Sequence, residues 1–346
     1  MNPREQLIPD FRVPSAARMY DYLLGGKDHF PADREMAERV LSVYPEARTL
    51  AVANRRFVAR AVWYLAEHGI TQYVDLGCGI PTSPMVHEIA RNVRPDARVV
   101  YVDSDPVVAA HFRSVCNNDS GLAFVECDIR ETQDILNDGQ FRRIINFSVP
   151  VAFLCAAVLH FVPDEDHPKG VVAALRWRMV PGSYLVISHA MTDDYSKDAI
   201  SAIEDVSKES AEQGPIPRTV EKISEFFTDL DLVEPGIVSM SQWRPGEPEE
   251  KTKIRFLAGV GRKPRDLPGW QTVIKEGKEM EDIVEQAVRA GREHREDMAR
   301  WLALEVLMSD EIAGQDEVLQ DRLSVLQEKI EEGLRVKTGG AHVAEE

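Results

Sequence analysis

Two glycines stand one residue apart in the segment Tyr73-Val-Asp75-Leu-Gly77-Cys-Gly79, which begins with the apolar pattern of a β-strand. Glycine lets the chain turn sharply and lets a ligand come close to the backbone. A helix after the turn would direct free N–H groups at that ligand. The residue three after Gly79 is Thr82, so the third glycine of a dinucleotide-binding motif is missing, and the Gly-Lys-Ser/Thr ending of a P-loop is absent too. The segment predicts a ligand-binding turn, although such a turn alone is weak evidence.

Two carboxylates follow the next apolar segments of the chain. Asp103 comes directly after residues 98–102, and Asp128 comes shortly after residues 122–126. A carboxylate at the first position could accept hydrogen bonds from both hydroxyls of a ribose, and one at the second could accept the amino group of adenine. An Asp at a strand end is commonly just a turn residue. Together with the glycine turn, however, the two predict a nucleoside site at the carboxyl ends of three strands, where open α/β sheets bind ligands.

Two histidines stand where a catalytic base could lie. His160 follows the apolar residues 151–155, and His189 ends the apolar residues 184–188. Histidine is the commonest general base, and we expect His189 to reach a cavity at the strand ends better than His160. The alternative is that each ring hydrogen-bonds to a neighbouring loop. No group of residues has the spacing of a metal site, so we expect no metal.

These residues need a scaffold that brings several strand ends together. Short apolar strands alternate with helical segments, which is typical of βαβ units in a parallel sheet covered on both faces. The last two strands are joined without a helix, so one of them should run antiparallel. The pattern predicts an α/β fold with a doubly wound, seven-stranded sheet whose last strand is antiparallel. The strands are expected at residues 73–76, 98–102, 122–126, 151–155, 184–188, 232–238 and 254–260.

Composition divides the chain into three parts. Residues 1–49 would form an N-terminal lid or cap, because prolines and a Gly-Gly pair make its first 32 residues irregular before a helix begins. Residues 50–264 would form the ligand-binding domain, which opens with a helix at 50–68. Residues 265–346 would form a C-terminal helical extension.

The C-terminal extension carries one apolar stripe at helical spacing. The stripe either packs on the chain's own core or forms a helical arm that binds a partner, and a homodimer is one such assembly. Its residues are Leu319, Leu323, Leu326, Ile330 and Leu334.

The overall charge narrows the possible partners. The 346 residues include 41 Lys and Arg against 58 Asp and Glu, a formal net charge of −17. Such a surface repels phosphate backbones and anionic lipids, so we expect neither nucleic acid nor membrane as a partner. There is no signal-peptide pattern and no apolar run of membrane-spanning length. The four cysteines form no CxxC pair, and a reducing, cytoplasmic setting is expected.

With these motifs in place, the sequence resembles the class I S-adenosylmethionine-dependent methyltransferases. Asp75-Leu-Gly77-Cys-Gly79 resembles their first motif, Tyr101-Val-Asp103 the second and Cys127-Asp128-Ile129 the third. Longer matching runs resemble an actinobacterial family of such enzymes over about residues 10–262, a family without a defined acceptor. These runs are residues 15–28, 75–82, 99–106 and 182–189.

The resemblance implies a Rossmann-like fold, S-adenosylmethionine as cofactor and roles for several residues. Asp75, Gly77 and Gly79 would line the methionine moiety, and Asp103 would hold the ribose with Ser104 as a weaker contact. Asp128 and Ile129 would flank the adenine.

The N-terminal segment at residues 15–28 has two interpretations. Arg18, Tyr20 and Asp21 precede a Gly-Gly pair, so the segment could be a lid that closes over the cofactor, with Tyr20 and Asp21 contributing to binding. Alternatively, Arg18 and Asp21 merely pair with each other on a short helix.

The function expected from this combination is methyl transfer by in-line displacement to a small-molecule or peptide acceptor of specialised metabolism. Cys155-Ala156-Ala157 stands where many amino-group methylating enzymes carry an Asn/Asp-Pro-Pro-aromatic tetrapeptide, which argues against methylation of nucleic-acid adenine or glutamine amides. A non-catalytic S-adenosylmethionine-binding protein and an enzyme of non-methyl chemistry remain the alternatives.

Overall fold

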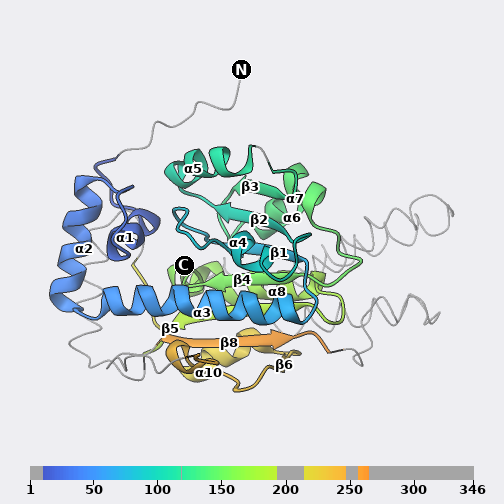
Figure 1. Ribbon diagram of the computed structural model, residues 1–346. Coiled ribbons are helices and arrows are strands. Elements are labelled where there is room, and N and C mark those ends of the chain that lie inside the picture. Colours follow the sequence, from blue (N-terminus) through green and yellow to red (C-terminus); the bar gives the residue numbers. More distant parts are fainter. Residues whose placement is uncertain (1–10, 118, 193–213, 247–255, 265–346) are drawn as a thin grey trace, which may run out of the picture. The chain divides into compact units, whose positions relative to one another are not determined.

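A computed structural model of the chain describes residues 11–117, 119–192, 214–246 and 256–264. In these residues one eight-stranded sheet forms the centre of the protein, in the order β3-β2-β1-β4-β5-β8-β6, and β7 pairs with β8 (Figure 1). The strands are β1 Gln72–Leu76, β2 Arg98–Asp103, β3 Leu122–Glu126, β4 Ala152–Ala156, β5 Tyr184–Ala190, β6 Asp231–Leu232, β7 Val238–Ser239 and β8 Phe256–Arg262.

The strand directions agree with the expected α/β fold. Strands β1 to β5 pair in parallel, and β8 runs antiparallel to β5, so the antiparallel last strand is confirmed. The number of strands differs, because the single strand expected at residues 232–238 is two short ones, β6 and β7, each paired with β8. Pro235 has no backbone N–H to donate to β8, and Gly236 has a φ of 87°, which is not an extended conformation. The hydrogen bonds to β8 are therefore interrupted between β6 and β7.

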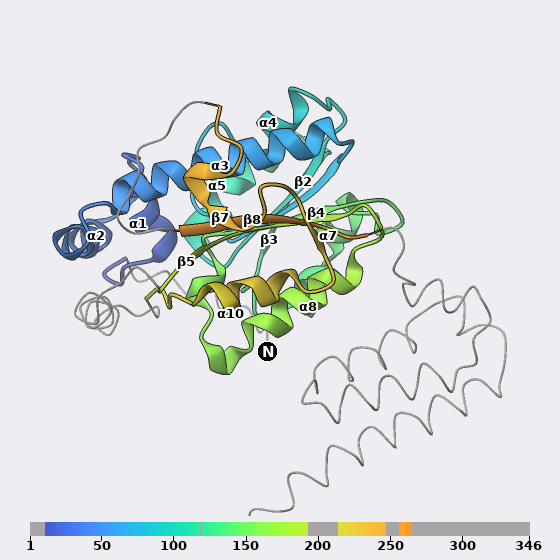
Figure 2. The same ribbon diagram turned by 90° about the horizontal axis from the view of Figure 1, so that it is seen from below.

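Helices cover both faces of the sheet (Figure 2). Alternate residues of each strand point to opposite faces, so Tyr73 and Val186 belong to one core, and Val74 and Ile187 belong to the other. The first face packs against α3 Ala47–Glu67, α4 Val86–Arg91 and α5 Pro106–Cys116. The second face packs against α6 Thr132–Asn137, α7 Gly139–Ile144 and α8 Pro168–Arg178, with α10 Val220–Ser224 beside α8.

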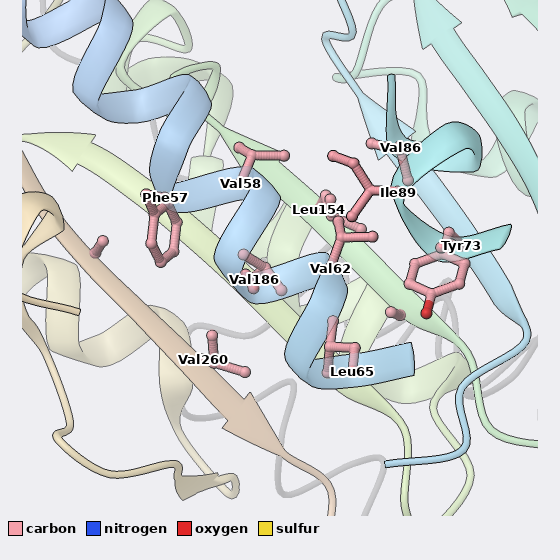
Figure 3. Close-up of a cluster of buried hydrophobic side chains, with 14 of the residues drawn as sticks. Phe57, Val58, Val62, Leu65, Tyr73, Val86, Ile89, Leu154, Val186 and Val260 are labelled. Atoms are coloured by element: carbon pink, nitrogen blue, oxygen red, sulfur yellow. The ribbon is translucent and has the colours of Figure 1, made fainter. Parts of the chain in front are cut away.

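The long helix α3 supplies much of the first core. Phe57, Val58, Val62 and Leu65 recur at helical spacing and point at the sheet, as Figure 3 shows. All four side chains are buried, and burying each contributes roughly 1.5–3 kcal/mol. This packing fixes α3 on the strands whose ends form the candidate site.

Two further helices, α1 Ala16–Leu23 and α2 Pro31–Val43, lie at one end of the sheet (Figure 1). We expected residues 1–32 to be irregular, and the helix α1 is therefore a correction. Arg18 and Asp21 are both buried on α1, so long-range contacts of polar groups stabilise it. Residues 265–346, with the apolar stripe, lie outside the described residues.

In the described ranges, no helix combines the length and the apolar composition needed to cross a bilayer. The same ranges hold no cluster of three or more His, Cys, Asp or Glu side chains that could bind a metal ion.

Candidate cofactor site

The turn after β1 is anchored to the neighbouring strand. The N–H groups of Gly77 and Cys78 both donate to the carbonyl of Val102, over 2.8 and 3.1 Å. Gly77 and Gly79 have φ angles of 68° and 66°, which glycine adopts without strain. A Cβ on Gly77 would lie 2.4 Å from Val158 Cγ2, whereas one on Gly79 would meet no atom within 4 Å. The first glycine therefore allows close packing, and the second leaves open space beside the backbone.

Asp103, at the end of β2, lies against this turn. Its Oδ2 accepts a hydrogen bond from the backbone N–H of Gly79 over 2.8 Å, and its Oδ1 accepts one from the N–H of Asp105 over 3.0 Å. These two hydrogen bonds hold the carboxylate in place, and a carboxylate oxygen can accept more than one hydrogen bond.

Asp75 is a buried carboxylate, with 7% of the residue exposed. Burial raises its pKa to about 6, with the Arg55 guanidinium lowering it and the Asp103 carboxylate raising it further. The guanidinium of Arg55 donates to the carbonyls of Thr82 and Pro84, over 2.7 and 2.8 Å. A cationic group of a ligand beside Asp75 would favour the ionised form of this carboxyl.

Asp128 follows β3 and is held by Arg130. The Asp128 carboxylate accepts hydrogen bonds from the Arg130 backbone N–H over 2.8 Å and from its guanidinium Nη2 over 2.7 Å. Partial burial raises the pKa of Asp128, but these hydrogen bonds outweigh burial and the net pKa is lowered. Arg130 also pairs with Asp166 over 2.6 Å, so the loop after β3 is tied to the loop after β4.

A cavity of about 690 Å³ connects these groups. It brings together most of the residues expected to form the site, which are Tyr20, Asp75, Gly77, Gly79, Asp103, Ser104, Asp128, Ile129 and His160. Asp21 and His189 do not line it. The nucleoside-binding positions thus meet at the carboxyl ends of β1, β2 and β3. Helices α1, α2 and α3 supply much of the remaining described wall, together with the loop after β4 and residues at the ends of β5 and β8.

The two candidate residues of α1 have different surroundings. The Tyr20 hydroxyl donates to the carbonyl of Ala51 over 3.0 Å and accepts from Asn54 Nδ2 over 3.0 Å, which places its ring in the cavity wall. The buried Asp21 carboxylate instead accepts hydrogen bonds from the Asp28 N–H over 2.9 Å and from the His29 ring over 3.0 Å. Asp21 stabilises the turn between α1 and α2 and does not face the cavity.

Arg18 pairs across the fold and not with Asp21. Its Nε lies 3.4 Å from Asp33 Oδ1 and 3.5 Å from Asp105 Oδ2, and its guanidinium donates to the carbonyl of Val13 over 2.7 Å. The hydroxyl of Ser15 also donates to Asp105. Because Asp105 is bonded through its N–H to Asp103, this cluster connects α1 and α2 to the candidate ribose site.

His189 is fully buried, and both its ring nitrogens have partners. Nδ1 lies 2.7 Å from the carbonyl of Ala190, and Nε2 lies 3.0 Å from the guanidinium of Arg218. Burial lowers the pKa of His189 to about 3; the Ala190 hydrogen bond opposes this and the Arg218 charge adds to it. The structure thus corrects our expectation that His189 reaches the cavity: on β5 it shares the sheet face of Leu185 and Ile187, and its ring lies 5.8 Å from that of Phe226.

His160 does line the cavity. Its Nδ1 is buried and has no hydrogen-bond partner in the part of the chain that the structure describes. Burial lowers the pKa of His160 well below its ordinary value, and the neighbouring His189 and Arg218 lower it further. The imidazole is therefore neutral at physiological pH, and a neutral imidazole can accept a hydrogen bond at one ring nitrogen.

Arg218 is a functional residue that no sequence pattern singles out. Its buried guanidinium donates to the carbonyls of Leu159 and Val162, over 2.9 and 2.7 Å, and to the Asp164 carboxylate over 2.8 Å. These bonds position the loop that carries His160. Only the fold brings residue 218 beside residues 159–164, so no local sequence pattern indicates the role.

Residues 3–264 match the model of a family described as S-adenosyl methyltransferase. The chain belongs to this family. A candidate methyltransferase from Thermobifida fusca is 39% identical, and the match covers 74% of this chain and 97% of that protein with a TM-score of 0.69. A DUF574-family protein from Streptomyces avermitilis is 36% identical, with coverages of 74% and 99% and a TM-score of 0.69. No curated protein matches the chain.

Membership confirms the expected cofactor, fold and enzyme class of this S-adenosyl methyltransferase. The groups of the cavity also fit S-adenosylmethionine, which carries an ammonium, a sulfonium and a ribose with two hydroxyls. Asp75 is a buried carboxyl whose ionised form a cation would favour, Asp103 is a fixed acceptor pair, and Gly79 leaves space beside the backbone. This methyltransferase therefore has suitable partners for the charged and hydroxyl groups of its cofactor.

Proposed function

We propose that this methyltransferase transfers the methyl group of S-adenosylmethionine to a small-molecule or peptide acceptor bound in the same cavity. Asp75, Gly77 and Gly79 receive the methionine moiety, and Asp103 receives the ribose with Ser104 beside it. Asp128 and Ile129 flank the adenine. The observation that carries the proposal is the hydrogen bond of Gly79 to Asp103, which fixes the carboxylate at the point where the ends of β1 and β2 converge.

The N-terminal helices complete the site in this proposal. Tyr20 contributes directly, because its ring lines the cavity and its hydroxyl is held by Ala51 and Asn54. Asp21 contributes indirectly by holding the turn that joins α1 to α2. Residues that enclose the cavity exclude water and align the reacting groups. Alignment and exclusion of water supply much of the rate enhancement in such a displacement.

When bound, S-adenosylmethionine supplies an activated methyl group on a sulfonium. Held by these residues, the cofactor would supply its methyl carbon to the acceptor nucleophile by in-line displacement, and the electron pair of the broken carbon–sulfur bond would stay on sulfur. In this proposal His160, a neutral imidazole in the cavity wall, accepts a hydrogen bond from the nucleophile and takes up the proton that the nucleophile loses. Arg218 acts as a positioning residue, because it holds the loop of His160, and His189 in turn contacts Arg218; neither of the two side chains lines the cavity.

The net charge of the chain supports a small-molecule or peptide acceptor over a nucleic acid. A net charge of −17 disfavours nucleic acids, whose phosphates would be repelled. The test is to incubate the purified full chain with S-adenosylmethionine and metabolite or peptide fractions of a cell extract, and to measure S-adenosylhomocysteine. Release that depends on one fraction supports methyl transfer. Tight cofactor binding with no release in any fraction would contradict it.

The role of His160 is tested on the acceptor so found. His160→Gln should lower turnover by about 100-fold, because general-base catalysis contributes factors of that order, and should leave cofactor affinity unchanged. The exposed His68 provides the matched control, and His68→Gln should behave as the unmodified chain. Turnover by His160→Gln close to that of the control would remove His160 from the mechanism.

A further inference from the structure

The cavity wall is divided into a charged part and an apolar part. Its charged side chains, within the described residues, come from the strand ends, the loops that follow them and one position of α3. These are Arg55, Asp75, Asp103, Asp105, Asp128 and Arg130. The part of the wall supplied by residues 14–51 contains no charged side chain. The charged partners suited to the cofactor therefore lie in the first part.

The apolar part is built from two helical stripes. Met19 and Leu23 are four residues apart on α1, and Met36, Val40 and Tyr44 are four apart along α2 and its end. Residues at this spacing share one face of a helix, so both stripes point into the cavity. We call the space that these five residues line the apolar chamber.

Among the residues that line the cavity, apolar side chains neighbour His160; Arg218 and His189 also lie near His160 but do not line the cavity. Phe161, Val162 and Pro163 follow His160 in the wall. The rings of Phe256 and His160 lie edge to face, with 5.4 Å between their centroids. The cavity wall beside the candidate base therefore resembles that of the chamber, and both differ from the acidic wall at Asp75 and Asp103.

We infer that the apolar chamber binds the methyl acceptor, and that this acceptor is an uncharged small molecule with an apolar body whose nucleophilic group is directed at His160. The inference rests on the proposed function. S-adenosylmethionine is charged and finds its partners in the acidic part, so the cofactor does not account for the apolar stripes. A charged acceptor would lose its hydration in the chamber without gaining a counter-ion from the described residues that line it, which opposes its binding.

The inference is tested with three probes that share one ring system and differ in charge, namely naphthol, naphthoate and naphthylmethylammonium. Each is titrated by fluorescence into the full chain saturated with S-adenosylhomocysteine. Naphthol should bind at least about tenfold more tightly than either ion, because the chamber offers an ion no compensation. Equal affinity for the three probes, or tighter binding of an ion, would overturn the inference.

A matched pair of substitutions locates the probe. Val40→Trp fills the chamber and should weaken naphthol binding at least about tenfold. Val52→Trp makes the same change at an exposed position of α3 that does not line the cavity, and should leave naphthol binding unchanged. Equal naphthol binding by both variants would overturn the inference.

Cofactor titration separates this test from that of the proposed function. S-adenosylmethionine should bind the unmodified chain and both variants with the same affinity, which also shows that the variants are folded. If it binds none of them, the proposed function fails. If it binds all three and naphthol does not discriminate as described, only the assignment of the chamber fails. Release of S-adenosylhomocysteine with a charged peptide fraction alone would likewise contradict an uncharged small-molecule acceptor.

Discussion

The backbone N–H of Gly79 donates a hydrogen bond to Asp103 Oδ2 over 2.8 Å, and this bond joins the ends of two adjacent parallel strands. The two residues are far apart in sequence, but the pairing of β1 with β2 brings them together. One bond thus fixes both the glycine turn and the carboxylate. Two glycines serve this arrangement in different ways.

Alanine substitutions should separate the roles of Gly77 and Gly79. Both positions have positive φ, so each alanine costs about 1–2 kcal/mol of stability. At Gly77 the new Cβ also clashes with Val158, which adds about 1–3 kcal/mol, whereas at Gly79 it meets open cavity space. Gly77→Ala should therefore lower the urea midpoint more, and Gly79→Ala should mainly weaken cofactor binding. The reverse order in unfolding and calorimetry would contradict this account of the turn.

Cofactor affinity should depend on pH through Asp75. Burial raises the pKa of Asp75 from 3.8 to about 6 in the free protein, so the carboxyl is protonated below that pH. A cationic cofactor group favours the carboxylate, so binding releases a proton below pH 6 and affinity rises as pH increases through about 6, then levels off. Calorimetry across this range should show the rise, and Asp75→Asn should abolish it. A flat profile for the unmodified chain would refute the placement of a cation at Asp75.

The same pKa has a consequence for stability without cofactor. The folded-state pKa lies above the ordinary value, so the folded chain binds this proton more tightly than the unfolded chain does. The contribution of Asp75 to the free energy of unfolding is therefore most favourable below about pH 4 and is lost as pH rises to about 6. Asp75→Asn should remove that loss from the pH dependence of the unfolding free energy.

The Arg18 cluster should couple the N-terminal helices to cofactor binding. Arg18→Met leaves Asp33 and Asp105 without their buried cation, which costs about 3–5 kcal/mol of stability in comparable sites. Because Asp105 is bonded to Asp103, the variant should also bind S-adenosylmethionine more weakly. Arg34→Met, an exposed position on α2, is the matched control and should change neither quantity. An Arg18→Met chain indistinguishable from this control would contradict the coupling.

The sheet could be predicted because its strands are local patterns. The strand expected at 122–126 is observed with the same bounds, and the others are shifted by one or two residues except at 232–238. At residues 232–238 the apolar residues predict one continuous strand, but Pro235 and Gly236 interrupt it. The glycine and carboxylate positions could also be predicted, since strand ends in a parallel sheet meet at one edge.

Contacts between distant segments could not be predicted in this way. Arg18 was expected either to belong to a lid or to pair with Asp21, and its partners Asp33 and Asp105 depend on how α1 lies on the sheet. The face of His189 could have been predicted, because alternation along β5 places it with Leu185 and Ile187. The position of His160 in the cavity wall instead depends on Arg218, which the sequence places far away.

Calorimetric titration of S-adenosylmethionine into Asp103→Ala tests the central claim most directly. Loss of the hydrogen bonds to both ribose hydroxyls should cost about 3 kcal/mol, which weakens binding by about 100-fold. Asp96→Ala, at an exposed position before β2, is the control, and a thermal melt of both variants verifies their fold. If folded Asp103→Ala binds the cofactor as tightly as the control does, the strand ends do not converge on its ribose.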